Sequence, residues 1–497
     1  MINVVSSDVS RKSDELTIKS GVLSKTLMDN AARSIFNFIV SNNFQTKKIA
    51  IICGKGNNGG DGYCLACQML SEGISHKVFG FAGHLSTDAQ YYALEYLKMN
   101  GKINLLDDVE NFNDFDVIVD AIFGTGLNKP LEGVYFDTIK KVNESKAYVI
   151  SADISSGLNA DNGLVEGIAV RADTTVTFQS AKLGHYLNDG RDYSGKLVVC
   201  DIGINLLEKT AEVIEQSDVK KFFEPMKINL HKGDLGKSAI IGGSKNFIGA
   251  PWLASMGTFA LRVGSGLSYL GIPECIYDAI SDKVIDNIIY TFKSDDGVIE
   301  FDAEALEKFV NIDALAIGMG LGKCEDINKI VEFMLKKSTA KLLLDADALN
   351  LIDLNLLKNQ RGRVVVTPHP KEFSRLIKVA TCDILKNPIE LSKSFAKQYN
   401  CVVLLKGATS IITDGKDVLL NISGTAGMAK GGSGDLLDGV IVGLMARGLN
   451  NFEACSVGAY IAGRSAEIAV LRGDLNNYSM LASDRVGFIT CAVNELV

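Results

Sequence analysis

Two amide side chains and a carboxylate lie close together in a glycine-rich segment, Gly54-Lys-Gly-Asn-Asn-Gly-Gly-Asp-Gly62. Asn57, Asn58 and Asp61 can hydrogen-bond a ligand or coordinate a cation through oxygen. The glycines of the segment fit the G-x-G-x-x-G pattern, whose backbone N–H groups can approach a phosphate. The same composition also fits a purely structural turn that Asp61 caps, and both interpretations stay open on this segment alone.

Aspartates follow two further apolar runs. Asp120 is followed by Ala-Ile-Phe-Gly-Thr-Gly-Leu127, and Asp153 lies within Ser151-Ala-Asp-Ile-Ser-Ser-Gly-Leu158. Each aspartate alone fits a loop cap. In open α/β sheets, however, ligands bind beyond the carboxyl ends of the strands. Three polar strand ends of this kind therefore predict one crevice that holds a ligand.

An ordinary nicotinamide dehydrogenase is disfavoured by the residues that follow the glycine-rich loop. That fold expects an acidic residue at the end of the next strand, but Phe81-Ala-Gly-His84 stands there. The loop also lacks the Gly-Lys-Ser/Thr ending of a P-loop.

The strongest local pattern of the chain is Gly424-Thr-Ala-Gly-Met-Ala-Lys-Gly-Gly-Ser-Gly-Asp-Leu-Leu-Asp-Gly439. Backbone N–H groups around Gly432 to Gly434 lead into an apolar helix expected over residues 436–445. A helix N-terminus of this kind attracts a phosphoryl group. Asp435 follows in the first turn. It is either a helix cap or a base that takes a proton from a substrate hydroxyl as phosphate arrives.

The segments between these motifs alternate between apolar runs and amphipathic helical patterns. This alternation is typical of a mostly parallel sheet with helices on both faces. Strands are expected over residues 48–53, 76–82, 116–123, 147–154, 174–179 and 196–202, and helices over 65–72 and 86–99. A second series of strands is expected over residues 238–244, 268–272, 314–318, 341–345, 363–367, 402–405 and 410–413. The charged segment 206–226 is helical in pattern and is expected to join the two halves.

Composition bounds the classes of function. The 497 residues are enough for two or more domains of ~100–200 residues each. A net charge of −8 argues against a general binder of nucleic acid or anionic membranes. No apolar run approaches the ~18 residues that span a membrane, and residues 1–15 lack an apolar signal core. The ten cysteines are scattered, which is typical of a reducing cytoplasm, so we expect a cytoplasmic protein.

One cysteine pair, Cys64 and Cys67, has C-x-x-C spacing where a helix is expected to start. No second pair of cysteines or histidines stands nearby. We therefore interpret the two residues as packed helix positions, with redox or metal chemistry as the alternative.

The first half resembles the NAD(P)H-hydrate epimerase family over residues 1–205. The resemblance rests on Asn57-Asn-Gly-Gly-Asp61, Val119-Asp-Ala-Ile-Phe-Gly-Thr-Gly-Leu127 and Ala152-Asp-Ile-Ser-Ser-Gly157. It implies a Rossmann-like doubly wound α/β domain over residues 1–216 that interconverts the R and S epimers of hydrated NAD(P)H. The substrate contacts that it implies are Asn57, Asn58, Gly59, Gly60, Asp61, Gly124, Thr125, Gly126, Leu127, Asn128, Lys129, Pro130 and Asp153.

The same resemblance implies a potassium ion at Asn58, Asp120 and Ser156. Asp153 is our candidate for the acid/base group that breaks and remakes the C6–O bond of the hydrate. One departure is Ser155, which stands where proline is usual. Losing that ring removes a fixed φ and no functional group.

The second half resembles the ribokinase-like superfamily and, within it, ADP- or ATP-dependent NAD(P)H-hydrate dehydratase, over residues 217–497. Besides the Gly-Ser-Gly-Asp run, the matching motifs are His231-Lys-Gly-Asp-Leu-Gly236, Ile241-Gly-Gly-Ser244, Gly249-Ala250, Ile317-Gly-Met-Gly-Leu-Gly322, Asp345-Ala-Asp-Ala-Leu-Asn350, Thr367-Pro-His-Pro-Lys-Glu372 and Leu405-Lys-Gly-Ala-Thr409. The resemblance implies nucleotide contacts from Lys406, Gly407, Ala408, Thr409, Ser410 and Gly434, and substrate contacts from Ala250, Gly320, His369 and Asp435. The departures are Lys371 where glycine is usual and Met319 where proline often stands.

The implied substrate is a nicotinamide ring hydrated at C6. Hydroxide leaves poorly, whereas phosphorylation of the hydroxyl converts it into phosphate, which leaves readily. In this hypothesis Asp435 accepts the hydroxyl proton, and the amides of Gly432 to Gly434 hold the phosphoryl group. Mg²⁺ would bridge the phosphates of ADP or ATP. The expected partners are NAD(P)H hydrates and an adenine nucleotide, and the chain is expected to form a homo-oligomer.

Two other interpretations stay open. A ribokinase-like small-molecule kinase fused to a Rossmann-like nucleotide-binding module would share the Gly-Ser-Gly-Asp loop but release a stable phosphorylated product. A non-enzymatic nucleotide- or RNA-binding module would be expected to lack Asp61, Asp120 or Asp153, and all three are present.

Overall fold

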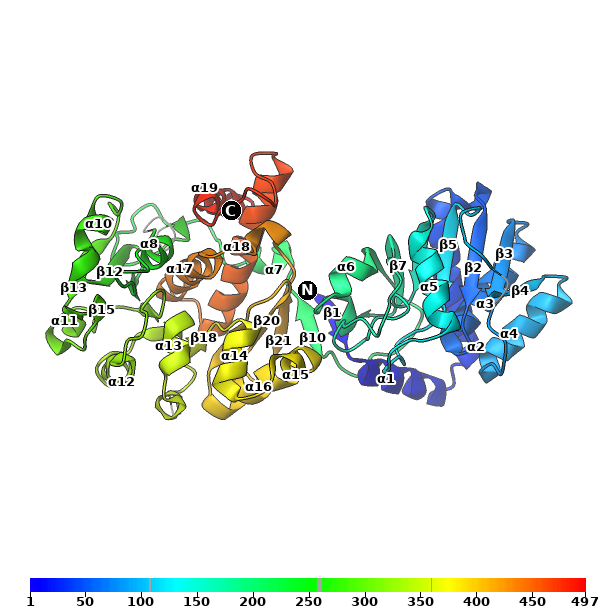
Figure 1. Cartoon of the computed structure of the whole chain (residues 1–497), viewed down its shortest axis with the longest axis horizontal. Coiled ribbons are helices and arrows are strands. Elements are labelled where there is room, and N and C mark those ends of the chain that lie inside the picture. The colour runs from blue at the N-terminus through cyan, green and yellow to red at the C-terminus, as the bar shows by residue number, and fades with distance from the viewer. Residues whose placement is uncertain (107–108, 257–261, 359) are drawn as a thin grey trace. The chain divides into compact units, whose positions relative to one another are not determined.

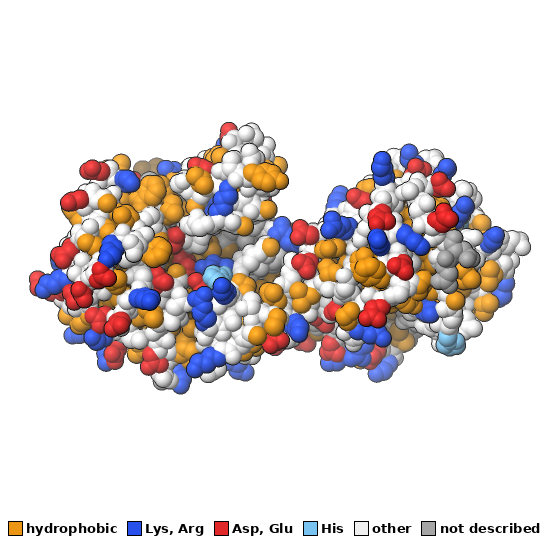
Figure 2. All heavy atoms as spheres, in the orientation of Figure 1, with side chains coloured by type: hydrophobic (Ala, Val, Ile, Leu, Met, Phe, Trp, Pro, Cys, Tyr) orange, Lys and Arg blue, Asp and Glu red, His pale blue; other side chains and the backbone are white. Residues whose placement is uncertain are grey.

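The chain forms two compact units (Figure 1). The structure is a computed structural model that describes residues 1–106, 109–256, 262–358 and 360–497. We call residues Ile2–Ala211 the N-terminal unit, and Glu212–Val497 together with Met1 the C-terminal unit. Acidic and basic side chains are interspersed over the drawn face of each unit (Figure 2). None of the helices in the described part of the chain has both the length and the apolar character that crossing a membrane requires.

The N-terminal unit is built on a parallel sheet of strand order β4-β3-β2-β5-β6-β7-β9. The strands are Ile103–Leu105 (β4), His76–Gly80 (β3), Ile49–Cys53 (β2), Val117–Ala121 (β5), Tyr148–Ala152 (β6), Thr174–Phe178 (β7) and Lys196–Cys200 (β9). Ile51 of β2 pairs with Val78 on one side and Val119 on the other. Outside this seven-stranded sheet, Ile2–Val5 (β1) pairs in parallel with Ala181–Lys182 (β8).

Helices cover both faces of this sheet (Figure 1). They are Ser7–Lys19 (α1), Ser24–Ser41 (α2), Asn57–Ser71 (α3), Thr87–Lys98 (α4), Val134–Glu144 (α5) and the short Gly190–Ser194 (α6). Because side chains alternate along a strand, Ile49 and Ile51 of β2 pack with α2, α3 and α4. Ala50 and Ile52 enter the other apolar layer, with α5. The predicted doubly wound architecture is thus confirmed.

The C-terminal unit has a longer, mostly parallel sheet of strand order β13-β12-β11-β16-β17-β18-β19-β20-β21-β10. The strands are Ile288–Phe292 (β13), Leu267–Pro273 (β12), Lys237–Ile241 (β11), Ala314–Ile317 (β16), Lys341–Leu344 (β17), Val364–Val366 (β18), Val402–Leu405 (β19), Ser410–Thr413 (β20), Val418–Asn421 (β21) and Ala211–Val213 (β10). Pairing is antiparallel only between β19, β20 and β21 among the described strands of this sheet. A small hairpin joins Ser294–Asp295 (β14) to Val298–Ile299 (β15).

The helices of the C-terminal unit are Gln216–Lys220 (α7), Gly249–Ser255 (α8), Tyr277–Ser281 (α10), Ala303–Glu307 (α11), Ile327–Lys337 (α12), Ala346–Leu351 (α13), Pro370–Ile377 (α14), Thr381–Lys386 (α15), Pro388–Tyr399 (α16), Ser433–Ala446 (α17), Asn451–Leu471 (α18) and Val486–Asn494 (α19). The apolar α17 is buried from Leu436 to Ala446. Gly439 of α17 and its N-cap Gly432 allow close packing against α8, because a Cβ on Gly439 would lie 2.2 Å from the carbonyl oxygen of Ala254 and one on Gly432 would lie 2.5 Å from Leu253 Cδ1.

Most predicted strands are present with their ends shifted by a few residues, but two predictions differ from the structure. The helix predicted over residues 65–72 begins earlier, at Asn57, because the glycine-rich segment is its first turn. The junction predicted as helical over residues 206–226 contains strand β10, followed by the short α7. Its strand form depends on pairing with β21, a partner far along the chain that local pattern does not reveal.

Candidate active sites

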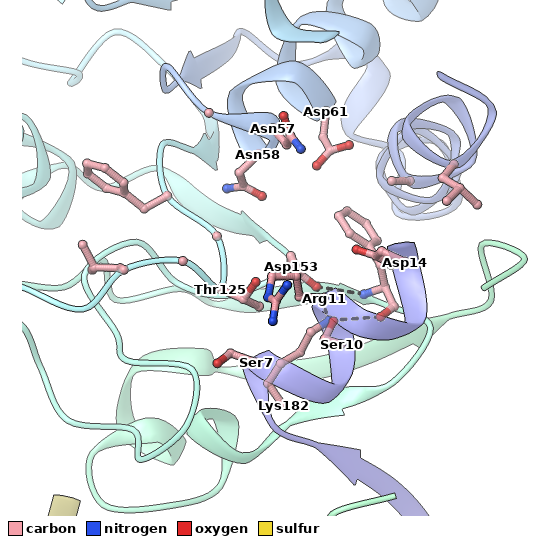
Figure 3. Close-up of a pocket in the computed structure, with 18 of the residues that line it drawn as sticks. Ser7, Ser10, Arg11, Asp14, Asn57, Asn58, Asp61, Thr125, Asp153 and Lys182 are labelled. Carbon is pink, nitrogen blue, oxygen red and sulfur yellow. Dashed lines mark hydrogen bonds and ion pairs between the residues drawn. The ribbon is translucent and has the colours of Figure 1, made fainter. Parts of the chain in front are cut away.

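A cavity of about 880 Å³ lies in the N-terminal unit, beyond the carboxyl ends of β2, β5 and β6. Figure 3 shows Asn57, Asn58 and Asp61 of α3 on one side of it, and Asp153 and Lys182 on the other. The remaining wall includes Ser7, Ser10, Arg11 and Asp14 of α1 and residues Gly124, Thr125, Gly126, Leu127, Asn128 and Lys129 of the loop after β5. Three strand ends therefore do meet at one polar cavity.

Close backbone packing fixes the glycine-rich loop at this cavity. A Cβ on Gly54 would lie 1.8 Å from the carbonyl oxygen of Ile122, and one on Gly59 would lie 1.9 Å from that of Gly54. Only glycine fits such contacts. Gly56 is the N-cap of α3, so Asn57, Asn58 and the residues after them form the first helical turn. These glycines thus hold the start of the helix against the sheet, whatever ligand the cavity takes.

Asp120 joins the loops that follow β5 and β6. Its carboxylate is fully buried and accepts hydrogen bonds from Ser151 Oγ (2.8 Å), Ser156 N (2.9 Å) and Ser156 Oγ (2.6 Å). Ser156 Oγ itself accepts a hydrogen bond from Phe123 N at 2.8 Å. Burial raises the pKa of Asp120, and the hydrogen bonds offset only part of that rise.

Asp153 follows β6 with a left-handed backbone, at φ 65°. Its N–H donates to the carbonyl oxygen of Val176 at 2.8 Å, and its Oδ1 accepts from Phe178 N at 3.2 Å and from the ammonium group of Lys182. Burial alone would raise the pKa of Asp153, but the charge and hydrogen bond of Lys182 hold it below the usual value. Asp153 therefore presents an ionised carboxylate to the cavity from a left-handed backbone.

His185 locks the Asp153 segment to the Lys182 segment. Its Nδ1 accepts a hydrogen bond from Lys182 N at 3.0 Å, and its Nε2 lies 3.0 Å from the carbonyl oxygen of Asp153. Nε2 therefore carries the proton in this network. Burial, helped by the charge of Lys182, lowers the pKa of His185 to about 4, so the ring is neutral at pH 7.

Ser155 stands where the resemblance leads us to expect proline, and a hydrogen bond replaces the missing ring. The hydroxyl of Ser155 donates to the carbonyl oxygen of Tyr193 at 2.9 Å. Two residues on, Gly157 has φ +98°, and a Cβ there would lie 1.9 Å from the carbonyl oxygen of Ile168. The loop is held by this bond and this packing.

Two more carboxyl groups belong to the same cavity. Burial and the negative charge of Asp153 raise the pKa of Asp14 to about 6. Burial raises the pKa of Asp61 well above its usual value, and the charges of Asp153 and Asp14 add to the rise. Three carboxyl groups on three different elements thus share one space, with Lys182 as the buried cation.

Most sequence-predicted residues of the first half reach this cavity. Asn57, Asn58, Asp61, Asp153 and the loop from Gly124 to Lys129 line it, whereas Gly59, Gly60, Asp120, Pro130 and Ser156 are not among its lining residues. Sequence reasoning missed Asp14 and Lys182. A lysine within the apolar run after β7 was the one available signal for Lys182, because a buried lysine needs a carboxylate partner.

The predicted C-x-x-C pair lies within α3. Cys64 is buried and Cys67 is partly buried, and both are free thiols. Burial raises the pKa of Cys64 and raises that of Cys67 to about 11. Neutral thiols are poor nucleophiles and metal ligands, which supports the interpretation as packed helix residues.

In the C-terminal unit, the predicted motifs meet around the start of α17. Lys406, which follows β19, places Nζ 2.7 Å from Oδ1 and 2.8 Å from Oδ2 of Asp345, which follows β17. A Cβ on Gly434 would lie 3.3 Å from that Nζ and 3.6 Å from Asp345 Oδ2. The ion pair therefore stands directly beside the helix N-terminus, where backbone N–H groups lack helical partners.

Asp435 lies in the first turn of α17, beside this ion pair. Burial raises its pKa to about 7, and the negative charge of Asp345 contributes to the rise. Asp438, one turn further, is fully buried and accepts a hydrogen bond from Thr367 Oγ1 at 3.2 Å. Burial and Asp345 raise its pKa well above the usual value. Asp435 thus titrates near neutrality, which suits a general base.

Ala250 and Gly320 are neighbours, as a shared substrate contact requires. A Cβ on Gly320, where φ is +66°, would lie 2.9 Å from the Cβ of Ala250. The carbonyl oxygen of Gly320 accepts a hydrogen bond from Ser244 Oγ at 2.9 Å. Met319, the departure from the expected proline, has its side chain fully buried in the core. The loop after β16 is therefore anchored on both sides of Gly320.

His369 caps α14. Its Nδ1 accepts from Lys371 N at 3.1 Å and Glu372 N at 3.3 Å, while Glu372 Oε2 accepts from His369 N at 2.9 Å. This capping box fixes the ring and leaves Nε2 near the surface, because the side chain is 46% exposed. Lys406 N donates to the carbonyl oxygen of Pro368 at 2.9 Å, so the His369 loop adjoins the Lys406 loop.

Comparisons with protein families match both units. One family profile, described as NAD(P)H-hydrate dehydratase, matches residues 238–485. Another, described as YjeF-related protein N-terminus, matches residues 24–184.

Individual proteins match over nearly the whole chain. A Dictyoglomus turgidum protein named bifunctional NAD(P)H-hydrate repair enzyme is 32% identical over 99% of this chain and 98% of that protein. A Thermofilum pendens protein of the same name is 34% identical over 92% of this chain and 89% of that protein. A solved ribokinase-like superfamily protein from Enterococcus faecalis, 19% identical, covers 59% of this chain and 99% of that chain with a TM-score of 0.50, which bears on the fold alone.

Proposed function

The chain belongs to the family of bifunctional NAD(P)H-hydrate repair enzymes, and from this premise we propose that its two units carry out consecutive repair steps. The N-terminal unit is the epimerase, which interconverts the R and S forms of NAD(P)H hydrate. The C-terminal unit is the dehydratase, which returns the S form to NAD(P)H with consumption of ADP or ATP. We assign the epimerase domain to residues 1–216 and the dehydratase domain to residues 217–497.

The observation that carries the dehydratase step is the position of Asp435 at the start of α17, beside the pair of Lys406 and Asp345. A carboxylate with a pKa of about 7 is ionised often enough at neutral pH to accept the proton of the C6 hydroxyl. The free N–H groups at the helix start stabilise the negative charge of the transferred phosphoryl group. Once the oxygen carries phosphate, the ring nitrogen can expel it.

The nucleotide is assigned to the loop from Lys406 to Ser410 and to Gly434, and the hydrate to Ala250, Gly320, His369 and Asp435. The lysine side chain is held by Asp345, so its charge is fixed at the helix start. Mg²⁺ fits this place, because the carboxyl groups of Asp435 and Asp345 carry like charge. A divalent cation beside them would offset their repulsion. Bound with the nucleotide, it would neutralise the phosphates.

In the epimerase step, Asp153 is the acid/base group at the C6–O bond. Lys182 keeps it ionised at neutral pH, so it enters the step as a base. The dinucleotide would be held by Asn57, Asn58, Asp61 and the loop Gly124 to Pro130. Among the described residues named for this step, Asp153 is ion-paired to a cation and Asp61 is not.

Potassium is proposed at Asn58, Asp120 and Ser156. The donor set is made of amide, carboxylate and hydroxyl oxygens, which suit a hard cation. Asn58 Nδ2 is buried without a hydrogen-bond partner among the described residues. A flip of the side-chain amide would place Oδ1 at that position instead. A Cβ on Gly124 would lie 3.5 Å from Asn58 Oδ1, so Asn58 adjoins the loop that Ser156 binds. The ion would add positive charge beside the substrate.

Mixed R and S hydrates given to the full chain with Mg²⁺ and either ADP or ATP test this function. We expect complete recovery of the near-ultraviolet absorbance of NAD(P)H. Recovery of only part of it would contradict the epimerase assignment. No recovery, together with phosphorylation of an unrelated alcohol, would contradict the dehydratase assignment in favour of a small-molecule kinase.

A further inference from the structure

We propose that Asp14, on α1, is a second catalytic acid/base group of the epimerase and acts with Asp153 from a different wall of the same cavity. The inference rests on the epimerase function proposed above. Asp14 precedes residues 24–184, the part of the first unit that the family profile matches. Nothing in the sequence motifs points to it, so its placement is a result of the fold.

The side chain of Asp14 faces the cavity, and one of its two carboxyl oxygens has no hydrogen bond to the described residues. It lines the cavity, and Figure 3 draws its carboxyl group in the same space that Asp61 and Asp153 face. Its Oδ1 is buried and has no hydrogen-bond partner in the described part of the chain. A buried, unpartnered carboxyl oxygen is unfavourable unless a ligand supplies the missing hydrogen bond.

Helix α1 is held in place on either side of Asp14. Ser7 N donates to Asp161 Oδ1 at 2.6 Å at the start of the helix. Ser13 Oγ accepts from Leu207 N at 3.1 Å, one residue before Asp14. The next turn is fixed because Thr17 Oγ1 accepts from Asn205 N at 3.1 Å. Asp14 is therefore a positioned group on a helix that is bound to distant parts of the unit.

The environments of Asp14 and Asp153 shift their pKa values in opposite directions. Burial and the charge of Asp153 raise the pKa of Asp14, whereas Lys182 keeps that of Asp153 low. Two carboxyl groups whose environments separate their pKa values can serve as acid and base in one step. The other charged side chains that line this cavity are Asp8, Arg11, Asp61, Asp88, Lys129 and Asp161, and Glu15 also acts on Asp14.

The step balances with these two groups. One carboxylic acid gives its proton to the C6 hydroxyl, the C6–O bond breaks with its electron pair on oxygen, and water leaves. The lone pair of ring N1 forms a C6–N1 π bond, so the ring is cationic. Water then adds to C6 from the other face, N1 regains its lone pair, and the second carboxylate takes the released proton. The reverse epimerisation exchanges the roles of Asp14 and Asp153.

Asp61 is the competing candidate. It is 9% exposed, and its pKa is raised well above the usual value, mainly by burial. It lies on α3 beside Asn57 and Asn58, which are assigned to the dinucleotide, whereas Asp14 lines the cavity from α1. We therefore assign Asp61 to substrate binding and Asp14 to proton transfer.

The test follows absorbance recovery by the full chain on mixed hydrates with ADP or ATP and Mg²⁺. The S epimer should be consumed in a fast phase set by the dehydratase, and the R epimer in a slow phase set by the epimerase. Asp14→Asn is expected to keep the fast phase and its amplitude, and to slow the second phase by about 10²–10⁴-fold, toward the rate without protein. Glu144→Gln, at the exposed end of α5 and outside the cavity lining, should leave both phases unchanged.

The pH profile separates proton transfer from a structural role. In the unaltered chain, kcat/KM of the slow phase should fall above pH about 6, where Asp14 loses its proton, after subtraction of the rate without protein. Asp14→Asn should abolish this fall of kcat/KM. Asp14→Glu should keep part of the slow phase and should again show a fall of kcat/KM as the pH rises.

Two results would overturn the inference while leaving the epimerase function in place. The first is a full slow phase in Asp14→Asn. The second is a slow phase that Asp61→Asn loses, while Asp14→Asn still shows the fall of kcat/KM above pH about 6. If the unaltered chain shows no slow phase above the rate without protein, that result contradicts the epimerase function itself, and the inference with it.

Discussion

The ammonium group of Lys182 is paired with the carboxylate of Asp153 inside the cavity wall, where the two side chains are 2% and 14% exposed. A buried pair of this kind contributes little net stability, but loss of one partner leaves an uncompensated charge. The pair is therefore a condition for an ionised Asp153.

Lys182→Met is expected to destabilise the N-terminal unit by about 3–5 kcal/mol at neutral pH. Because the folded pKa of Asp153 is lowered, its ionised form stabilises the native chain above its unfolded pKa, and this contribution is lost as pH falls through the folded pKa. In the variant, burial without the lysine raises that pKa. The cost should then shrink as the pH is lowered, in calorimetric unfolding at neutral and mildly acidic pH.

Lys98→Met, on the surface of α4, should change stability by less than about 1 kcal/mol. An equal cost at both pH values would contradict this account.

Asp435→Asn should lower the rate of dehydration by about 10²–10⁴-fold while nucleotide binding persists. A base must be deprotonated, so kcat/KM of the unaltered dehydratase should fall as pH drops below about 7. Steady-state rates on S hydrate and calorimetric titration with nucleotide measure the two effects. The matched control is Glu304→Gln, an exposed acid in the first turn of α11, which should change neither. Full turnover by Asp435→Asn would refute the role of this carboxylate.

Gly54→Ala should destabilise the N-terminal unit by about 1–3 kcal/mol or more, since the new Cβ would overlap the backbone of Ile122. Gly126→Ala is the matched control in the neighbouring loop, because a Cβ there meets nothing within 4 Å. It should be neutral or stabilise the chain by up to about 1 kcal/mol. Denaturant unfolding compares the two variants, and equal midpoints would show that the loop is not fixed by this contact.

Potassium should stabilise the N-terminal unit, as any ligand of the native state does. At about ten times its Kd the gain is about 1.4 kcal/mol, seen as a higher unfolding temperature in KCl than in choline chloride of equal ionic strength. Ser156→Ala, which removes one proposed ligand, should reduce the difference. The same shift in both salts would argue against a potassium site.

Several features of this fold can be read from the sequence because they depend on local pattern. Apolar runs predicted the central strands, and the aspartates at their ends predicted the cavity that Asp61 and Asp153 share. Asp14 and strand β10 could not be predicted, because their roles come from partners distant in the chain. The charged pattern of α1 gives no sign of which acid turns inward, and the strand at Ala211–Val213 pairs with β21, which is far along the chain.

The central claim is that two separate sites in one chain complete one repair. It is tested most directly by complementation on mixed R and S hydrates with nucleotide and Mg²⁺. Within the time that the unaltered chain needs for full recovery, a chain with Asp435→Asn alone should restore almost no absorbance, and a chain with Asp153→Asn alone should restore only the S fraction. The two variants mixed should restore all of it. Complete recovery by either variant alone, or failure of the mixture to exceed the S fraction, would contradict the claim.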